Sequence, residues 1–187
     1  MTYDVSLSLA SLATGSVLAA SSLPGVIAPA ATKKFLLSLP RNYTAGVILM
    51  IASLAWSVWL LTSVLDLGEF TPQRGNMIIF VVALAAATIF FLPDYLFSRA
   101  WGVFLLLCTE ILLSACFPHD TRWKLLLVIM AYGWATSGLI FVSAPFTLRN
   151  LLERWNSTET MTRISSAVNL LIGTTLVILA FTVYSGK

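Results

Sequence analysis

The chain has 187 residues and a formal net charge of +3, and 58% of its residues are hydrophobic while only 10% are charged. Soluble domains carry about 25% charged residues, so this composition excludes a water-soluble globule and predicts an all-α integral membrane protein. The basic residues are spread over short loops and form no patch, which argues against nucleic acid as a partner. The expected partners are the lipid bilayer and other membrane proteins or a second copy of the chain.

The first apolar segment, residues 5–23, contains no charged residue but seven Ser or Thr residues. Their hydroxyls can bond to the preceding turn of a helix, which makes them tolerable in lipid. A cleaved signal peptide and a segment lying on the membrane surface are the competing interpretations. Because signal peptides begin with basic residues and this segment has none before it, a retained spanning helix is favoured.

Five stronger segments follow, each bounded by residues that end helices, such as Pro, Asn and Arg. A spanning helix needs about 20 mostly apolar residues, and the segments approach or meet that length. They cover residues 43–65, 77–92, 97–117, 125–144 and 164–184. The chain is therefore expected to form one polytopic membrane domain, residues 1–187, with six spans, or five if the first segment does not span.

Two connectors between these spans resemble each other. "APAATKKFLLSLPRNYTAGVIL" follows the first span and "APFTLRNLLERWNSTETMTRISSAVNLL" the fifth, and "PDYLFSRAWGVFLLL" is a shorter version. Residues 33–39 and 146–155 separate apolar from polar side chains at helical spacing, which predicts helices lying in the membrane interface. The repeat predicts three helical hairpins with basic turns on one face; it reflects either duplication or the needs shared by every membrane hairpin.

The pattern of a helix, Pro, an amphipathic segment, Arg and a second helix over residues 125–184 resembles the YjeT-like family of small two-helix bacterial inner-membrane proteins. The match covers about a third of the chain and rests on pattern, not on invariant residues. This family has no assigned chemistry, so the resemblance implies only a bacterial inner membrane and a hairpin architecture.

Counting Lys and Arg on each side of the membrane predicts the orientation, because cytoplasmic loops carry the excess. The connector side has seven basic residues and the opposite side four. The connectors should therefore face the cytoplasm, with both termini on the outer side. The seven are Lys33, Lys34, Arg41, Arg99, Arg149, Arg154 and Arg163, and the four are Arg74, Arg122, Lys124 and Lys187.

Glu110 lies near the middle of the apolar run "GVFLLLCTEILLSACF". An ionised carboxylate there costs about 2.5 kcal/mol or more to insert, so such residues usually face the bundle interior. Ser114, one turn further on, is a candidate hydrogen-bond donor. Three interpretations stay open: Glu110 fixes the register between helices, it belongs to a proton, cation or amine pathway, or it points into a small hydrated pocket.

Asn169 is the other polar group within a span that needs a partner, so the candidate binding residues are Glu110, Ser114 and Asn169. The sequence contains no recognisable nucleophile, zinc or phosphate-loop motif, so no catalytic residue, cofactor or metal site is predicted. His119, beside Asp120 in a loop, is expected to be solvated or to cap a helix. A non-enzymatic scaffold or accessory subunit that binds membrane proteins or lipids is favoured over a carrier or channel using Glu110, because the Pro residues lie only at span ends.

Overall fold

The computed structural model describes residues 6–64, 68–117 and 123–184, and it contains helices and no strand within these ranges. Six of the described helical segments are long and apolar enough to cross a membrane. This confirms the expected fold class, an all-α multi-pass membrane bundle with six spans. His119 and Asp120 lie outside the described residues. The spanning helices are α1 (Leu7–Ile27), α3 (Tyr43–Trp59), α4 (Arg74–Phe91), α5 (Leu96–Cys116), α6 (Lys124–Ser143) and α8 (Glu159–Thr182).

Three of the six spans, α1, α3 and α8, begin where a side chain satisfies a free N–H group of the first helical turn. Ser6 accepts a hydrogen bond from the Leu9 amide, Asn42 from the Ala45 amide and Thr158 from the Met161 amide. The first span is longer than expected, because α1 continues through Pro24 to Ile27. One π-helical turn, Leu60–Val64, extends α3, and a 3₁₀ segment, Gly68–Gln73, precedes α4.

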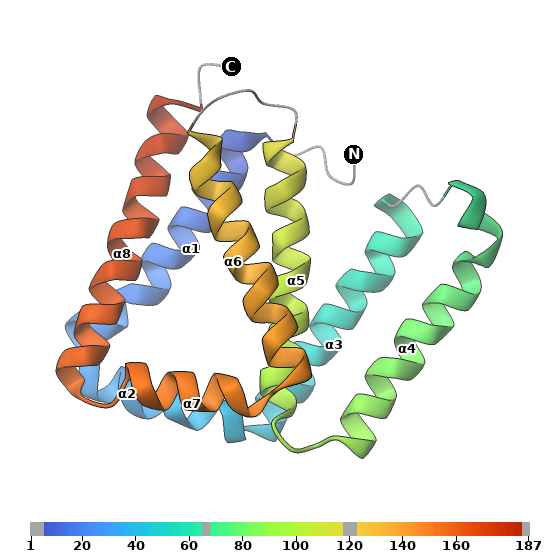
Figure 1. Ribbon diagram of the computed structural model, residues 1–187, viewed down its shortest axis with the longest axis horizontal. Helices are drawn as coiled ribbons and strands as arrows, with labels where there is room; N and C mark the ends of the chain where they lie inside the picture. Colours follow the sequence, from blue (N-terminus) through green and yellow to red (C-terminus); the bar gives the residue numbers. More distant parts are fainter. Residues whose placement is uncertain (1–5, 65–67, 118–122, 185–187) are drawn as a thin grey trace.

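Two short helices form the connectors and run across the ends of the spans at the base of the molecule (Figure 1). These are α2 (Pro29–Ser38), which a 3₁₀ turn (Leu39–Arg41) joins to α3, and α7 (Phe146–Trp155). Both expected connector helices are therefore present. The first starts before residue 33, at Pro29, because proline is favoured at the first position of a helix.

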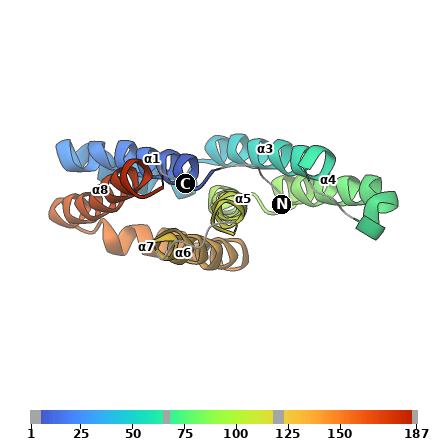
Figure 2. The ribbon, with the colours of Figure 1, turned by 90° about the horizontal axis from the view of Figure 1, so that it is seen from above.

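The expected pairing of the spans into three hairpins across the basic connectors is wrong. α1 packs mainly against α8, and α6 packs mainly against α5, so each connector joins two spans that belong to different pairs. The hairpins that do form, α3 with α4 and α5 with α6, turn at the opposite end of the molecule (Figure 1). Viewed from above, α1 and α3 lie in one layer, α6 and α7 in another, and α5 between them (Figure 2).

Glycines allow the close approaches that select these pairs. A Cβ atom on Gly173 of α8 would lie 2.7 Å from the backbone nitrogen of Ala19 and 2.8 Å from the Gly15 carbonyl of α1. In the second pair, a Cβ atom on Gly102 of α5 would lie 2.7 Å from the Gly138 carbonyl of α6. In both pairs the added Cβ atom would meet backbone atoms of the facing helix, so these glycine positions do not tolerate a side chain.

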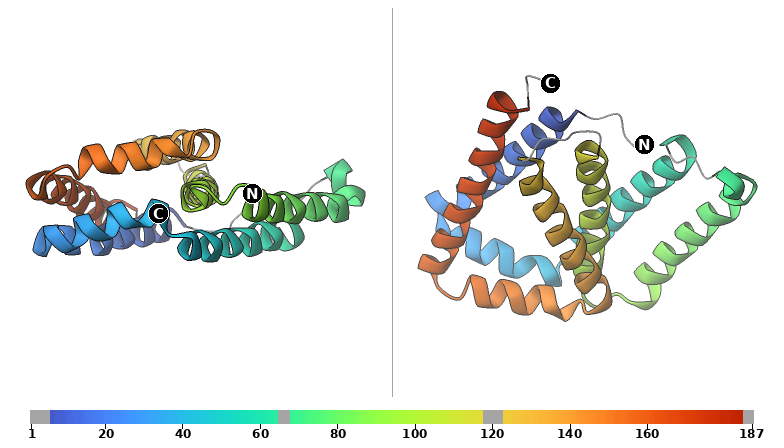
Figure 3. Two further views of the ribbon diagram at one scale, coloured as in Figure 1. Left: turned by 90° about the horizontal axis from the view of Figure 1, so that it is seen from below. Right: turned by 45° about the horizontal axis from the view of Figure 1, so that its top comes forward.

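The α1–α8 pair and the α5–α6 pair converge away from the connectors and diverge toward them (Figures 1 and 3). The apolar core at the convergent end combines residues of α1, α5, α6 and α8, including Leu7, Leu112, Leu127 and Leu176, each at most 2% exposed. At the base, α2 and α7 cross the space between the α1–α8 pair and the α5–α6 pair. This divergence leaves room for a cavity above α2 and α7.

Candidate binding cavity above the connectors

A cavity of about 450 Å³ lies where the two helix pairs diverge. We call it the floor cavity; α2 and α7 form its base, α1 and α8 one wall, and α5 the other. Its volume falls in the range of about 300–1,000 Å³ that is usual for ligand pockets. It is lined by Ser21, Ser22, Thr32, Leu36, Leu39, Phe97, Trp101, Leu148, Leu151, Leu152, Trp155, Asn156, Ser165, Ser166 and Asn169.

The wall and base contributed by α5 and α7 are apolar. Phe97 and Trp101 stack with ring centroids 6.2 Å apart and planes 9° apart, and Trp101 also stacks on Phe104 at 5.6 Å. The stacked rings of Phe97 and Trp101 therefore present a continuous aromatic surface to the cavity. Leu148 and Leu152, on the apolar face of α7, complete it.

The opposite wall is polar but uncharged. The hydroxyls of Ser21 and Ser22 both donate to the Leu18 carbonyl, at 3.1 and 2.6 Å, and the Ser165 hydroxyl donates to the Thr162 carbonyl at 3.1 Å. These bonds satisfy the hydroxyl protons within each helix, as is usual in lipid. The lone pairs of the oxygens remain available to a ligand.

Asn156 occupies the corner where α7 ends and the chain turns into α8. Its backbone N–H donates to the Leu152 carbonyl at 2.9 Å, and its side-chain nitrogen donates to the same carbonyl at 3.0 Å. The residue is only 3% exposed, yet its Oδ1 atom has no hydrogen-bond partner. Leaving a buried acceptor unpaired costs about 1–3 kcal/mol, and because this atom exposes less than 1 Å² of surface, a ligand in the cavity does not touch it.

The structure places Asn169, one of the sequence candidates, on the wall of the same cavity. Its side chain is exposed, and no described residue forms a hydrogen bond with it. Asn169 is ten residues beyond the first residue of α8, which corresponds to about 15 Å along the helix axis. The polar wall therefore extends well up the span.

The other two candidates do not belong to this cavity. Ser114 donates its hydroxyl to the Ile111 carbonyl at 3.2 Å and not to Glu110. Glu110 is partly buried, and no described residue gives it a hydrogen bond or ion pair. The structure thus separates Glu110 and Ser114 from Asn169 and forms no single site from the three.

Three further cavities lie elsewhere, and Glu110 and Ser114 line none of them. One of about 540 Å³ adjoins the starts of α3 and α5, and one of about 500 Å³ lies beside Phe80 of α4. The third, of about 320 Å³, lies between the α3–α4 hairpin and α5 and is lined by Arg99, whose guanidinium donates to the Leu92 carbonyl at 3.3 Å.

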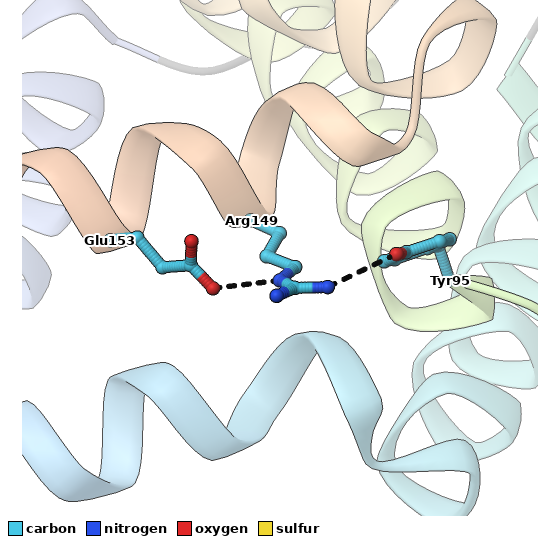
Figure 4. Close-up of polar contacts among 3 residues, drawn as sticks. All are labelled: Tyr95, Arg149 and Glu153. Carbon is cyan, nitrogen blue, oxygen red and sulfur yellow. Dashed lines mark hydrogen bonds and ion pairs between the residues drawn. The ribbon is translucent and has the colours of Figure 1, made fainter.

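Charged side chains that do not line the floor cavity link α7 and α2, which form its base, to neighbouring elements. Arg149 of α7 forms an ion pair of 2.7 Å with Glu153 and donates to the Tyr95 hydroxyl at 3.4 Å, which links α7 to the start of α5 (Figure 4). The bonds to Glu153 and then Tyr95 raise the pKa of Arg149 above its ordinary value, so it stays charged. Lys33 of α2 donates to the Ser157 carbonyl at 2.6 Å and so ties α2 to the turn before α8.

The backbone at Tyr95 has φ 56°, a left-handed conformation that is uncommon outside glycine. Tyr95 directly precedes α5 and presents its hydroxyl to Arg149. The Tyr95 ring therefore lies at the junction of α5 and the connector.

Sequence reasoning missed Asn156, which lines the cavity and is only 3% exposed. Its position just after an amphipathic helix is typical of an exposed turn residue, so nothing in the local sequence indicates its burial. Comparison of the chain with protein-family models, with curated proteins and with solved structures finds no match.

Proposed function

We propose that this multi-pass membrane protein is a non-enzymatic accessory or scaffold protein that binds a membrane lipid in the floor cavity. The observation that carries the proposal is the cavity itself, in which an apolar, aromatic wall faces a polar, uncharged wall. A lipid combines the same two properties, an apolar chain and a polar head, in one molecule.

The position of the cavity supports this assignment. It lies directly above α2 and α7, which cross the ends of the spans as interfacial helices do. Lipid heads lie at this level, and the hydrocarbon core begins just beyond it. A lipid could therefore enter from the bilayer without crossing a polar barrier.

A carrier or channel that uses Glu110 is the alternative, and the geometry favours it less. A transport site would need Glu110 to line a cavity or to meet a second polar group, but it lines none of the four cavities described above. Glu110 lies eleven residues, about three helical turns, beyond Arg99 on α5, so about 16 Å separates the two along the helix. This distance is too long for an ion pair within the helix.

We further propose that the protein lies in a bacterial inner membrane, with the connectors in the cytoplasm and both termini outside. Its proposed partners are lipid, together with other membrane proteins or a second copy of the chain. The excess of Lys and Arg on the connector side supports this orientation.

Photo-cross-linking tests whether a lipid occupies the cavity. The purified full chain in nanodiscs would be irradiated with 16-carbon amphipaths that carry a diazirine in the chain and an alcohol, methyl ester or carboxylate head. We expect at least one probe to label peptides containing Trp101 or Leu148, which line the cavity. Labelling confined to outward-facing residues such as Phe80 and Phe90, which are 67% and 78% exposed, would refute the proposal.

A further inference from the structure

We infer that the cavity of about 320 Å³ between the α3–α4 hairpin and α5 holds one acyl chain of an anionic phospholipid, whose phosphate binds the Arg99 guanidinium. We call it the hairpin cavity. It shares no lining residue with the floor cavity, so this inference concerns a second site and does not rest on the function proposed above.

The walls of the hairpin cavity suit an acyl chain. Its two hydroxyls are satisfied within their own helices, because Ser57 donates to the Ser53 carbonyl at 2.9 Å and Thr88 to the Leu84 carbonyl at 2.8 Å. Arg99 is the only ionisable residue among those that line the cavity. The remaining lining residues are apolar: Met50, Leu54, Val81, Leu84, Ala85, Leu92, Val103 and Val142.

Arg99 brings to this cavity a charge that no described residue neutralises. A guanidinium stays protonated in proteins, yet no described carboxylate forms an ion pair with Arg99, and Asp94 lines a different cavity. Its Nη1 atom donates to the Leu92 carbonyl at 3.3 Å. The Nε and Nη2 atoms are not among the buried atoms that lack a partner, so both are accessible. A basic group beside apolar walls is stabilised when an anion pairs with it.

The charge lies at the level where lipid phosphates lie. Leu92 directly follows α4 and Arg99 is the fourth residue of α5, so both are at the end of the spans that the connectors cross (Figure 1). From there the cavity reaches Val81, eleven residues before Leu92 and so about 16 Å along α4. A head at Arg99 therefore directs an acyl chain into the span region.

The lining also selects the head. A guanidinium pairs with two phosphate oxygens at once, and basic pockets between spans are typical sites of anionic lipid heads. No carboxylate lines the hairpin cavity to pair with the cation of a zwitterionic head. Phosphatidylglycerol should therefore bind better than phosphatidylcholine. Leu84 and Leu92 are 58% and 47% exposed, so the cavity is open to the bilayer and its lipid exchanges readily.

Because of this exchange, the test adds lipid back to the full chain purified in detergent. Native mass spectrometry would follow titrations with dioleoyl phosphatidylglycerol and dioleoyl phosphatidylcholine. We expect phosphatidylglycerol to bind at about tenfold lower concentration, since a hydrogen bond to a charged group accounts for a factor of this size. Arg99→Gln removes the charge but can still donate to the Leu92 carbonyl, and it should reduce the preference to less than about threefold.

Arg163→Gln is the matched control, because Arg163 is the fifth residue of α8, lies at the same end of the spans and lines none of the four cavities. It should keep the preference. If the unmodified chain does not prefer phosphatidylglycerol, or if the two Gln variants lose the preference equally, Arg99 does not bind the head and the inference is wrong. A lipid in the floor cavity does not mimic this result, because no charged residue lines that cavity.

A second pair of variants tests the place of the acyl chain. Leu84→Trp fills the hairpin cavity from α4 and should weaken phosphatidylglycerol binding about tenfold. Val82→Trp is the control, because Val82 is also exposed on α4 but does not line the cavity. Equal binding by these two variants would show that the chain lies elsewhere and would overturn the inference. Should Arg99→Gln not fold, this pair and the order of the two lipids on the unmodified chain still decide.

Discussion

Gly173 and Gly15 meet where α8 crosses α1, and their backbones approach so closely that neither position has room for a side chain. A Cβ atom on Gly173 would lie within 2.8 Å of backbone atoms of both Gly15 and Ala19. Gly133 of α6 is the opposite case, because a Cβ atom there would have no neighbour within 4 Å. The two positions therefore differ in packing although both are glycines within spans.

Gly173→Ala should lower the free energy of unfolding by about 1–3 kcal/mol, the usual effect of adding a methyl group to a closely packed contact. Gly133→Ala should leave it unchanged or raise it by up to about 1 kcal/mol, because alanine favours the helix. Thermal unfolding of the two purified variants in the same detergent measures both effects. Equal stability of the two variants would mean that α1 and α8 do not cross at these glycines.

The polar residues show how far single positions can be interpreted from sequence. Asn169 was expected to need a partner, and it lies on the cavity wall. Asn156 could not be singled out, because its burial depends on tertiary packing around the turn after α7, which local sequence does not encode. Glu110 is a candidate binding residue from sequence because it is an acid within a span, yet it lines none of the cavities described above.

At the scale of the helices, hydropathy predicted the spans well. The expected segments 97–117 and 125–144 differ by one residue at each end from α5 (Leu96–Cys116) and α6 (Lys124–Ser143). Stops such as Pro93 and Pro145 determine these bounds locally. The amphipathic connector α7 was predicted at the residues it occupies, because the separation of its polar and apolar faces is a local property as well.

The pairing of the spans was not predicted, and the reason is physical. In lipid an apolar face does not drive helices together, since the surrounding chains are equally apolar. Pairing depends instead on close approaches such as those at Gly102 and Gly173, whose partners lie on other helices. Sequence proximity suggested that α1 would pair with α3, whereas the glycines pair it with α8.

At the scale of the whole molecule, the two connectors lie at the same end of the bundle, and the turn between α3 and α4 lies at the other (Figure 1). If the connectors face the cytoplasm, a cysteine at Ser157 should react with a membrane-impermeant maleimide only after cells are permeabilised. A cysteine at Gly75, whose Cβ atom would have no neighbour within 4 Å, should react in intact cells.

This labelling would use a chain in which Cys108 and Cys116, both within α5, are replaced by alanine. The reverse pattern would invert the orientation without changing the fold. Labelling of both sites in intact cells would contradict the arrangement of the connectors and the α3–α4 turn on opposite sides of the membrane.

The most direct test of lipid binding in the floor cavity is native mass spectrometry of the chain released from its membrane in mild detergent. The unmodified chain should retain one lipid. Ser21→Trp, which fills the cavity from α1, should lose it, whereas Ser16→Trp, also exposed on α1 but not lining the cavity, should keep it. If no lipid is retained, or if both variants retain it equally, the floor cavity does not bind the lipid and the proposed function is wrong.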